Sequence, residues 1–302
     1  MKAFIIKIAL ISLAILILFS AANTAYINSD YFKSSFINWE RFEDLPQEID
    51  IVNTGSSHAA SGINYSVLEG FNCRQFSAAG QTLEYDLKLL KQYSGNLKRG
   101  GIVIIPINHL SFTRLDEEMQ LKHSLRYYRI LEPGFIEGFN LSDYMLYKVF
   151  PILTSDNELF DAMKKKPINT TSRTMADYTQ TQIANAIARN KASYFDQYEY
   201  DPKCLDTLCE IIEFAYELDM RPVMVTIPVS DAYGQLSNET MINNFNKALE
   251  YVIEKYGVEY YGYAQDTDIA SNYELFKNTN HLNKQGSLVF SEKLFMDLGL
   301  LP

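Results

Sequence analysis

The sequence of 302 residues predicts an α/β protein: a three-layer α/β/α arrangement with a mainly parallel five-stranded sheet. Short apolar runs alternate with amphipathic stretches along most of the chain, which is typical of strands connected by helices. A separate apolar segment at the beginning adds an N-terminal transmembrane helix. The 47% hydrophobic content is enough for a sizeable core, and an α/β domain of about 200–250 residues is ordinary.

The first segment, Ala3–Ala22, is almost entirely apolar, with Lys2 and Lys7 as the charges at or near its start. About 20 apolar residues suffice to cross a bilayer, and lysines on the amino side favour a cytoplasmic N-terminus. We therefore expect residues 1–25 to anchor the protein in the cell membrane by a single pass, with residues 26–302 outside the cytoplasm. A cleaved secretory signal is the alternative, because Ser20-Ala21-Ala22 is an acceptable cleavage site. The protein would then be secreted or periplasmic.

The predicted elements follow in order. Strands are expected at Ile49–Thr54, Arg74–Ser77, Ile102–Ile107, Pro222–Ile227 and Val258–Tyr261. Helices are expected at Ser57–Glu69, Thr82–Leu97, Lys203–Leu218, Glu239–Tyr256 and Lys284–Leu298. The pairs Gly100-Gly101 and Arg221-Pro222 are interpreted as breaks between a helix and the next strand.

Two polar segments about 220 residues apart stand out. The first, Asn53–Ser61, follows the first predicted strand and puts Ser57 on a strand-to-helix turn at the carboxyl edge of the sheet, where open α/β sheets place ligands and nucleophiles. The second, Asn278–Asn283, puts His281 just before the last helix. A serine and a histidine brought together are the minimum for an activated hydroxyl nucleophile.

These segments resemble the motif blocks of the SGNH (GDSL-like) hydrolase superfamily. Within it they resemble the membrane-anchored branch that includes the D-alanyl-lipoteichoic acid biosynthesis protein and alginate O-acetylation proteins. The matching residues are Gly55-Ser56-Ser57, Phe76-Ser77-Ala78-Ala79-Gly80, Ile102–His109 with Asn108, and Asn278-Thr279-Asn280-His281. The resemblance covers roughly residues 45–110 and 203–300 and implies the flavodoxin-like SGNH fold.

The resemblance also implies roles for these residues. Ser57 would attack an ester carbonyl and His281 would act as the base. The oxyanion hole would be formed by the Gly80 N–H, the Asn108 side-chain amide and the Ser57 N–H. Water would resolve the acyl-enzyme in an esterase, and a polymer hydroxyl would resolve it in an acyltransferase.

One residue departs from the family pattern, because Asn278 stands where the last block has aspartate. An asparagine can hydrogen-bond the imidazole, but it carries no charge and could hold the wrong tautomer. Asp266 and Asp268 are the nearest carboxylates that could replace it. His58 and His109 fall inside motif blocks and are expected near the pocket, although His58 would more often cap or pack.

The implied substrate is a cell-surface polysaccharide or teichoic-acid-like polymer, and the implied partner is a membrane-bound O-acyltransferase. Two alternatives remain open. The chain could be a weakly active or inactive scaffold that binds the polymer or the acyltransferase, or it could be a secreted esterase for small substrates.

Residues 111–202 form a predicted insertion, too long for a simple crossover. Its aromatic residues are Tyr127, Tyr128, Phe135, Phe139, Tyr144, Tyr147, Phe150 and Phe160. Because the interval leaves the sheet just after Asn108, it could form a lid over the active site. The alternative is a helical subdomain whose aromatic side chains form its own core.

Composition excludes other classes. The 27 basic and 37 acidic residues give a net charge of −10, which disfavours nucleic acid as a partner. His58, His109, His123 and His281 are scattered without zinc-ligand spacing, so neither a metal nor a cofactor is expected. Cys73, Cys204 and Cys209 do not form a disulfide framework.

Overall fold

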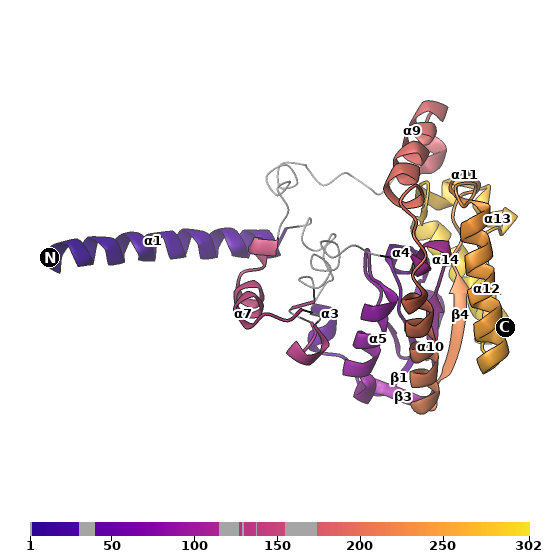
Figure 1. The fold of residues 1–302 in the computed structure, drawn as a ribbon, viewed down its shortest axis with the longest axis horizontal. Coiled ribbons are helices and arrows are strands. Elements are labelled where there is room, and N and C mark those ends of the chain that lie inside the picture. The colour runs from indigo at the N-terminus through magenta and orange to yellow at the C-terminus, as the bar shows by residue number, and fades with distance from the viewer. Residues whose placement is uncertain (1, 30–39, 115–126, 129, 137, 155–173) are drawn as a thin grey trace. The chain divides into compact units, whose positions relative to one another are not determined.

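The computed structural model describes residues 2–29, 40–114, 127–128, 130–136, 138–154 and 174–302 (Figure 1). The chain divides into two compact units. The larger unit comprises residues 45–116 and 169–302, and the smaller comprises residues 1–44 and 117–168.

The larger unit is built on a parallel five-stranded sheet with the order β2-β1-β3-β4-β5. Its strands are β1 (Ile49–Asn53), β2 (Cys73–Gln75), β3 (Leu97–Pro106), β4 (Arg221–Thr226) and β5 (Glu259–Gly262). This is the flavodoxin-like order, in which the direction of winding reverses between β1 and β3 and ligands bind outside the carboxyl ends of those strands. The predicted fold class is confirmed.

Helices cover the sheet in two groups. The longer ones are α5 (Leu83–Gln92), α10 (Pro202–Glu217), α12 (Glu239–Tyr256) and α14 (Lys284–Asp297). Helix α10 packs beside α5 and α12, whereas α14 packs beside α4 (Ser57–Gly62). Phe290 and Leu294 of α14 share a buried cluster with Ile104 and Val223 of the sheet.

Helix α12 illustrates how sequence determines an element. Its buried residues Met241, Phe245, Ala248 and Val252 recur at helical spacing, so they form one apolar face. The Asn238 side chain accepts the Met241 N–H at the start, and Gly257 ends the helix at φ 65°. The predicted bounds of this helix are confirmed.

Several predicted boundaries are wrong. Helix α5 ends at Gln92 rather than Leu97, and Arg221-Pro222 begins β4 instead of preceding it. Helix α4 ends at Gly62 rather than Glu69, because Ile63 is extended and Asn64 caps a separate 3₁₀ turn at Tyr65–Val67. Strand β3 begins at Leu97, so Gly100-Gly101 lies inside a strand instead of preceding one. There Gly100 has φ +75°, and a Cβ on Gly101 would lie 2.6 Å from the Asp50 carbonyl oxygen. These glycines permit an irregular, close strand pairing.

The remaining elements of the larger unit are short, apart from α9 (Gln180–Asn190). They include α11 (Asp231–Gly234), α13 (Thr267–Ala270) and the antiparallel pair β6 (Phe276–Asn278) and β7 (His281–Leu282). None of these four short elements was predicted. Within the insertion, residues 174–201 belong to the larger unit, and Phe160 lies outside the described residues.

The smaller unit contains α1 (Lys2–Ile27), α3 (Glu40–Glu43) and α7 (Leu141–Val149), which is followed by a 3₁₀ turn at Pro151–Thr154. Helix α1 is long and apolar enough to cross a membrane, and its side chains from Lys2 to Leu18 are exposed. Tyr128, Phe139, Tyr144 and Tyr147 make ring contacts with one another in this unit. These aromatic residues of the insertion therefore form a local cluster.

Candidate active site

The candidate site begins at the turn between β1 and α4, which places Ser57 at the carboxyl edge of the sheet. Gly55 has φ +104°, and a Cβ there would lie 3.0 Å from Ala59 and 3.1 Å from Pro106. Glycine is therefore needed for both the backbone angle and the space. Ser57 is the first residue of α4, so the turn presents its hydroxyl beside the helix N-terminus.

The buried carboxyl group of Asp86 supports this turn through hydrogen bonds. The Gly55 N–H donates to Asp86 Oδ1 at 2.9 Å, and Gln81 Nε2 donates to the same oxygen at 2.6 Å. Burial raises the pKa of Asp86 to about 7. Asp86 thus connects the turn that carries Ser57 to the loop that carries Gly80. Sequence reasoning missed it, although an acidic residue in the first turn of an apolar-faced helix was a visible signal.

His281 reaches Ser57 from the β6–β7 hairpin. Its Nε2 lies 2.8 Å from Ser57 Oγ across 224 residues of sequence. Two side chains hold the hairpin turn: Ser230 Oγ donates to the Thr279 carbonyl at 2.6 Å, and Asn190 Nδ2 donates to Thr279 Oγ1 at 2.9 Å. The structure therefore brings the two predicted residues together and braces the histidine.

Asn278 fixes the tautomer of His281. Its Oδ1 accepts the backbone N–H groups of Asn280 at 3.2 Å and His281 at 2.9 Å, and it lies 3.1 Å from His281 Nδ1. Because two backbone donors set the amide orientation, the oxygen faces the ring and Nδ1 must carry the proton. Nε2 is then free to accept from Ser57. The geometry therefore contradicts the expectation that this asparagine could hold the wrong tautomer.

The surroundings of His281 disfavour its protonated form. Burial lowers its pKa to about 3, with further contributions from His58 and Lys277. Of the two proposed substitute carboxylates, Asp266 is engaged elsewhere: it caps α13 by accepting the Asp268 N–H at 3.2 Å and forms an ion pair with Lys293. Among the residues that the structure describes, the imidazole therefore hydrogen-bonds Asn278 and Ser57 and no carboxylate.

Asn108 follows β3 on the other side of the reversal point. Its Oδ1 accepts the Leu110 N–H at 2.8 Å, which turns Nδ2 toward His58 Nδ1 at 3.3 Å. One amide hydrogen is used in this contact, and the second remains for an oxyanion. Gly80, the other predicted donor, lies in a turn at φ +68°.

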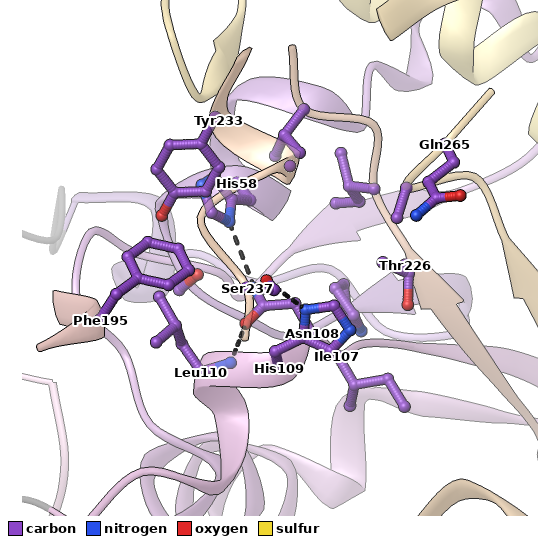
Figure 2. Close-up of a pocket in the computed structure, with 16 residues that line it drawn as sticks. His58, Ile107, Asn108, His109, Leu110, Phe195, Thr226, Tyr233, Ser237 and Gln265 are labelled. Atoms are coloured by element: carbon purple, nitrogen blue, oxygen red, sulfur yellow. Dashed lines mark hydrogen bonds between the residues drawn. The ribbon is translucent and has the colours of Figure 1, made fainter. Parts of the chain in front are cut away.

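His58 and His109 both line one pocket (Figure 2). Burial lowers the pKa of His58 to about 4, and its ring lies 5.1 Å from that of His281. Because Asn108 donates to its Nδ1, Nε2 carries the hydrogen and has no hydrogen-bond partner among the described residues. His109 Nδ1 lies 2.7 Å from Ser237 Oγ, and its ring packs edge-on against Phe245.

The pocket lies at the carboxyl ends of β3, β4 and β5 and has a cavity volume of about 70 Å³. Apolar side chains form most of its wall, and Ser56 and His58 connect it to the Ser57 turn. Phe195 reaches it from the insertion. The further lining residues that sequence reasoning missed include Thr226, Ile227, Val229, Tyr233, Ser237 and Gln265. Thr226 ends β4, Tyr233 lies in α11 and the other four lie in loops. None of them belongs to a motif, so only the topology identifies them.

Metal ligation has no support in the part of the chain that the structure describes, where no three His, Cys, Asp or Glu side chains converge on one point. The chemistry available at this site is that of a hydroxyl nucleophile and a neutral imidazole.

No protein-family model matches the chain, and no curated protein matches it in sequence. Among solved structures, the chain is similar to a GDSL-like lipase from Bacteroides thetaiotaomicron, with 10% identity, a TM-score of 0.42, and coverage of 87% of this chain and 97% of the other. It is also similar to a psychrotrophic esterase from Pseudoalteromonas sp., with 11% identity, a TM-score of 0.41, and coverage of 83% and 97%. An acetyl xylan esterase from Geobacillus stearothermophilus has 9% identity, a TM-score of 0.41, and coverage of 85% and 98%. These values do not identify an activity for this chain.

Proposed function

We propose that this protein is an exported serine O-acyl esterase or acyltransferase of the SGNH type. It acts on ester groups of a cell-envelope polysaccharide or teichoic-acid-like polymer. One observation carries the proposal: Ser57 Oγ lies 2.8 Å from the nitrogen of His281 that Asn278 leaves unprotonated. A hydroxyl paired with an oriented neutral imidazole is the arrangement that nucleophilic acyl transfer requires.

In the first step, Ser57 Oγ attacks the ester carbonyl while His281 Nε2 takes the hydroxyl proton. The tetrahedral intermediate collapses, the C–O bond to the leaving alcohol breaks, and His281 returns the proton to that alcohol. Water or a polymer hydroxyl then attacks the acyl-enzyme, again losing its proton to His281. The bond between the acyl carbon and Ser57 Oγ breaks, and His281 returns the proton to Ser57. The first acceptor gives a free acid, and the second gives a new ester.

The negative charge of each intermediate would be met by the second hydrogen of Asn108 Nδ2, the Gly80 N–H and the Ser57 N–H at the start of α4. Removal of one such donor costs about 3–4 kcal/mol of transition-state stabilisation at comparable sites. These neutral donors would carry most of the stabilisation of that negative charge, because the surroundings of His281 disfavour a positively charged imidazolium.

The adjoining pocket supports a short acyl group. Its volume of about 70 Å³ is less than half of the roughly 150 Å³ in which an engineered protein cavity holds benzene. Its wall is mainly apolar, which suits the hydrocarbon part of an acyl chain. The rest of a polymer would stay outside.

Membrane attachment is part of the proposal. Helix α1 continues without a break through Ser20-Ala21-Ala22, the site at which a signal sequence would be cut. Beyond it, Asn23 and Tyr26 are buried in the smaller unit. An uncleaved anchor keeps these contacts intact, and it would place the enzyme beside a membrane-bound O-acyltransferase.

A non-catalytic scaffold is the second candidate, favoured by Asn278 in place of a carboxylate. The two candidates are separated by incubating the purified full-length protein with acetylated and with de-acetylated envelope polymer and following acetate release by NMR. The esterase proposal expects release that is lost in Ser57→Ala and retained in Ser56→Ala. Polymer binding without release, equal in the wild type and Ser57→Ala, would establish the scaffold.

A further inference from the structure

The smaller unit carries a second apolar surface, on helix α7. Leu141, Met145 and Val149 are exposed by 64%, 56% and 55%. Their spacing of four residues places them in one stripe along the helix. Leu146, exposed by 43%, widens the stripe.

The opposite side of α7 is packed, so the helix cannot turn the stripe inward. Tyr144 and Tyr147 contact the buried ring of Tyr128 at centroid distances of 5.7 Å and 6.0 Å. Tyr144 also contacts Phe139 at 5.3 Å. The aromatic side fixes the rotation of the helix and leaves the aliphatic side outward.

Helix α7 is attached to the end of α1. The side chain of Asn23 donates to the Val149 carbonyl at 3.3 Å and accepts the Ile152 N–H at 3.1 Å. The Phe150 ring packs against Phe19 at 5.1 Å. These contacts hold the end of α7 at the level of residues 19–23 of α1, and Figure 1 shows α7 near that end.

That level coincides with the expected edge of a bilayer. The unbroken run of exposed residues in α1 ends at Leu18. Counted from Ala3, it spans about 24 Å at roughly 1.5 Å per residue. A hydrocarbon core of about 30 Å therefore extends past Leu18 to the turn of α1 on which Phe150 packs. The α7 stripe then lies at the boundary between acyl chains and head groups.

We propose that α7 is a membrane-interface helix, whose Leu141, Met145 and Val149 side chains insert into the outer face of the lipid bilayer that α1 crosses. The occupant of the stripe is lipid, because the Val149 end of the stripe is held beside the last turns of the apolar helix α1. Lys148, whose Nζ bonds the Tyr144 hydroxyl at 2.8 Å, supplies a charged group at head-group level. The inference rests on α1 as an anchor and is independent of catalysis.

Tryptophan quenching in the full-length protein tests this directly. The chain has one tryptophan, Trp39, so Trp39→Phe provides a silent background. In that background Met145→Trp and Leu141→Trp report the stripe, Asp143→Trp reports the other side of α7, and Leu10→Trp reports α1. Each variant is reconstituted in phosphatidylcholine vesicles with or without lipid brominated near the head-group end of the chains.

We expect bromine to quench both stripe positions at least about threefold more than position 143, as an interfacial helix requires. Deeply brominated lipid should quench the Leu10→Trp variant. Equal quenching at 141, 143 and 145 in variants with unchanged circular dichroism would overturn the proposal. So would an absence of quenching at position 10, because α1 would then not lie in the membrane.

Discussion

At the scale of single residues, Asn278 separates two tasks that a catalytic aspartate performs together. Its Oδ1 orients the ring and fixes the tautomer of His281 through three hydrogen-bond contacts. It cannot stabilise the imidazolium, which His58 and Lys277 also disfavour. We therefore expect the proposed acyl transfer to be slow, because His281 is correctly oriented but has no charged partner.

Restoring the carboxylate should accelerate the enzyme. In Asn278→Asp the side chain keeps the acceptor that faces Nδ1 and adds a charge, so turnover of p-nitrophenyl acetate should rise at least about tenfold. Asn278→Ala, which removes the orienting oxygen, is the matched control and should lower turnover. An unchanged rate in Asn278→Asp would contradict the assignment of His281 as the base.

The pH dependence of the rate should reflect the lowered pKa of His281. The base must be neutral, and a pKa of about 3 keeps it neutral throughout the mildly acidic range. An ordinary imidazole with a pKa of about 6.5 would lose about thirtyfold in kcat/KM between pH 8 and pH 5. We expect little loss in the wild type over that interval. In Asn278→Asp the acid limb should move to higher pH, and its failure to move would argue against contact between residues 278 and 281.

At the scale of elements, Asp86 joins two loops that must keep a fixed distance if Ser57 and Gly80 are to meet one oxyanion. Its folded pKa of about 7 exceeds the value of 3.8 for an unperturbed carboxyl, so the stability it contributes is complete below about pH 4 and is lost as pH rises through 7. The resulting loss of folding free energy at high pH is at most about 4 kcal/mol.

Asp86→Asn should remove that dependence, since an amide oxygen can still accept from Gly55 and Gln81. Thermal melting at pH 5 and at pH 8 measures it: the variant should gain stability relative to the wild type at the higher pH. Asp86→Ala, which leaves the buried Gly55 N–H unsatisfied, should be destabilised at both values by about 1–3 kcal/mol. Parallel pH curves for the wild type and Asp86→Asn would show that Asp86 does not titrate in this range.

The strands and longer helices could be predicted because hydrophobic periodicity determines them, as in α12. The turn at Gly55–Ser57 and the segment Asn278–Asn283 that carries His281 were located from their residues, but the β6–β7 hairpin formed by that segment was not predicted. The end of α4 could not be predicted, because the Asn64 side chain caps a separate 3₁₀ turn that competes locally with the helix. The role of Asp86 and the pocket wall depend on contacts between distant loops, which periodicity does not encode.

At the scale of the whole molecule, the insertion is divided between the two compact units. Its last part, residues 174–201, belongs to the larger unit, where Asn190 holds the His281 hairpin and Phe195 lines the pocket. Residues 174–201 are therefore the part of the insertion that could act as a lid. Because they also hold the His281 hairpin, we expect them to affect activity on every substrate and not only on polymers.

Asn190→Ala should therefore reduce activity on small and polymeric esters alike, by several-fold, because Thr279 loses a partner that braces the turn before His281. The control is Arg189→Ala, a substitution of the exposed neighbouring residue, which should change activity little. A loss confined to polymer would instead indicate that the segment acts as a lid.

The central claim is that His281 activates Ser57. Active-site labelling with a fluorophosphonate, read by intact-protein mass spectrometry and peptide mapping on the full-length protein in detergent, tests it most directly. We expect one adduct on Ser57 in the wild type and in Ser56→Ala, no adduct in Ser57→Ala, and labelling in His281→Ala slowed at least about a hundredfold. Labelling that persists in Ser57→Ala but disappears in Ser56→Ala, or proceeds at the wild-type rate in His281→Ala, would contradict it.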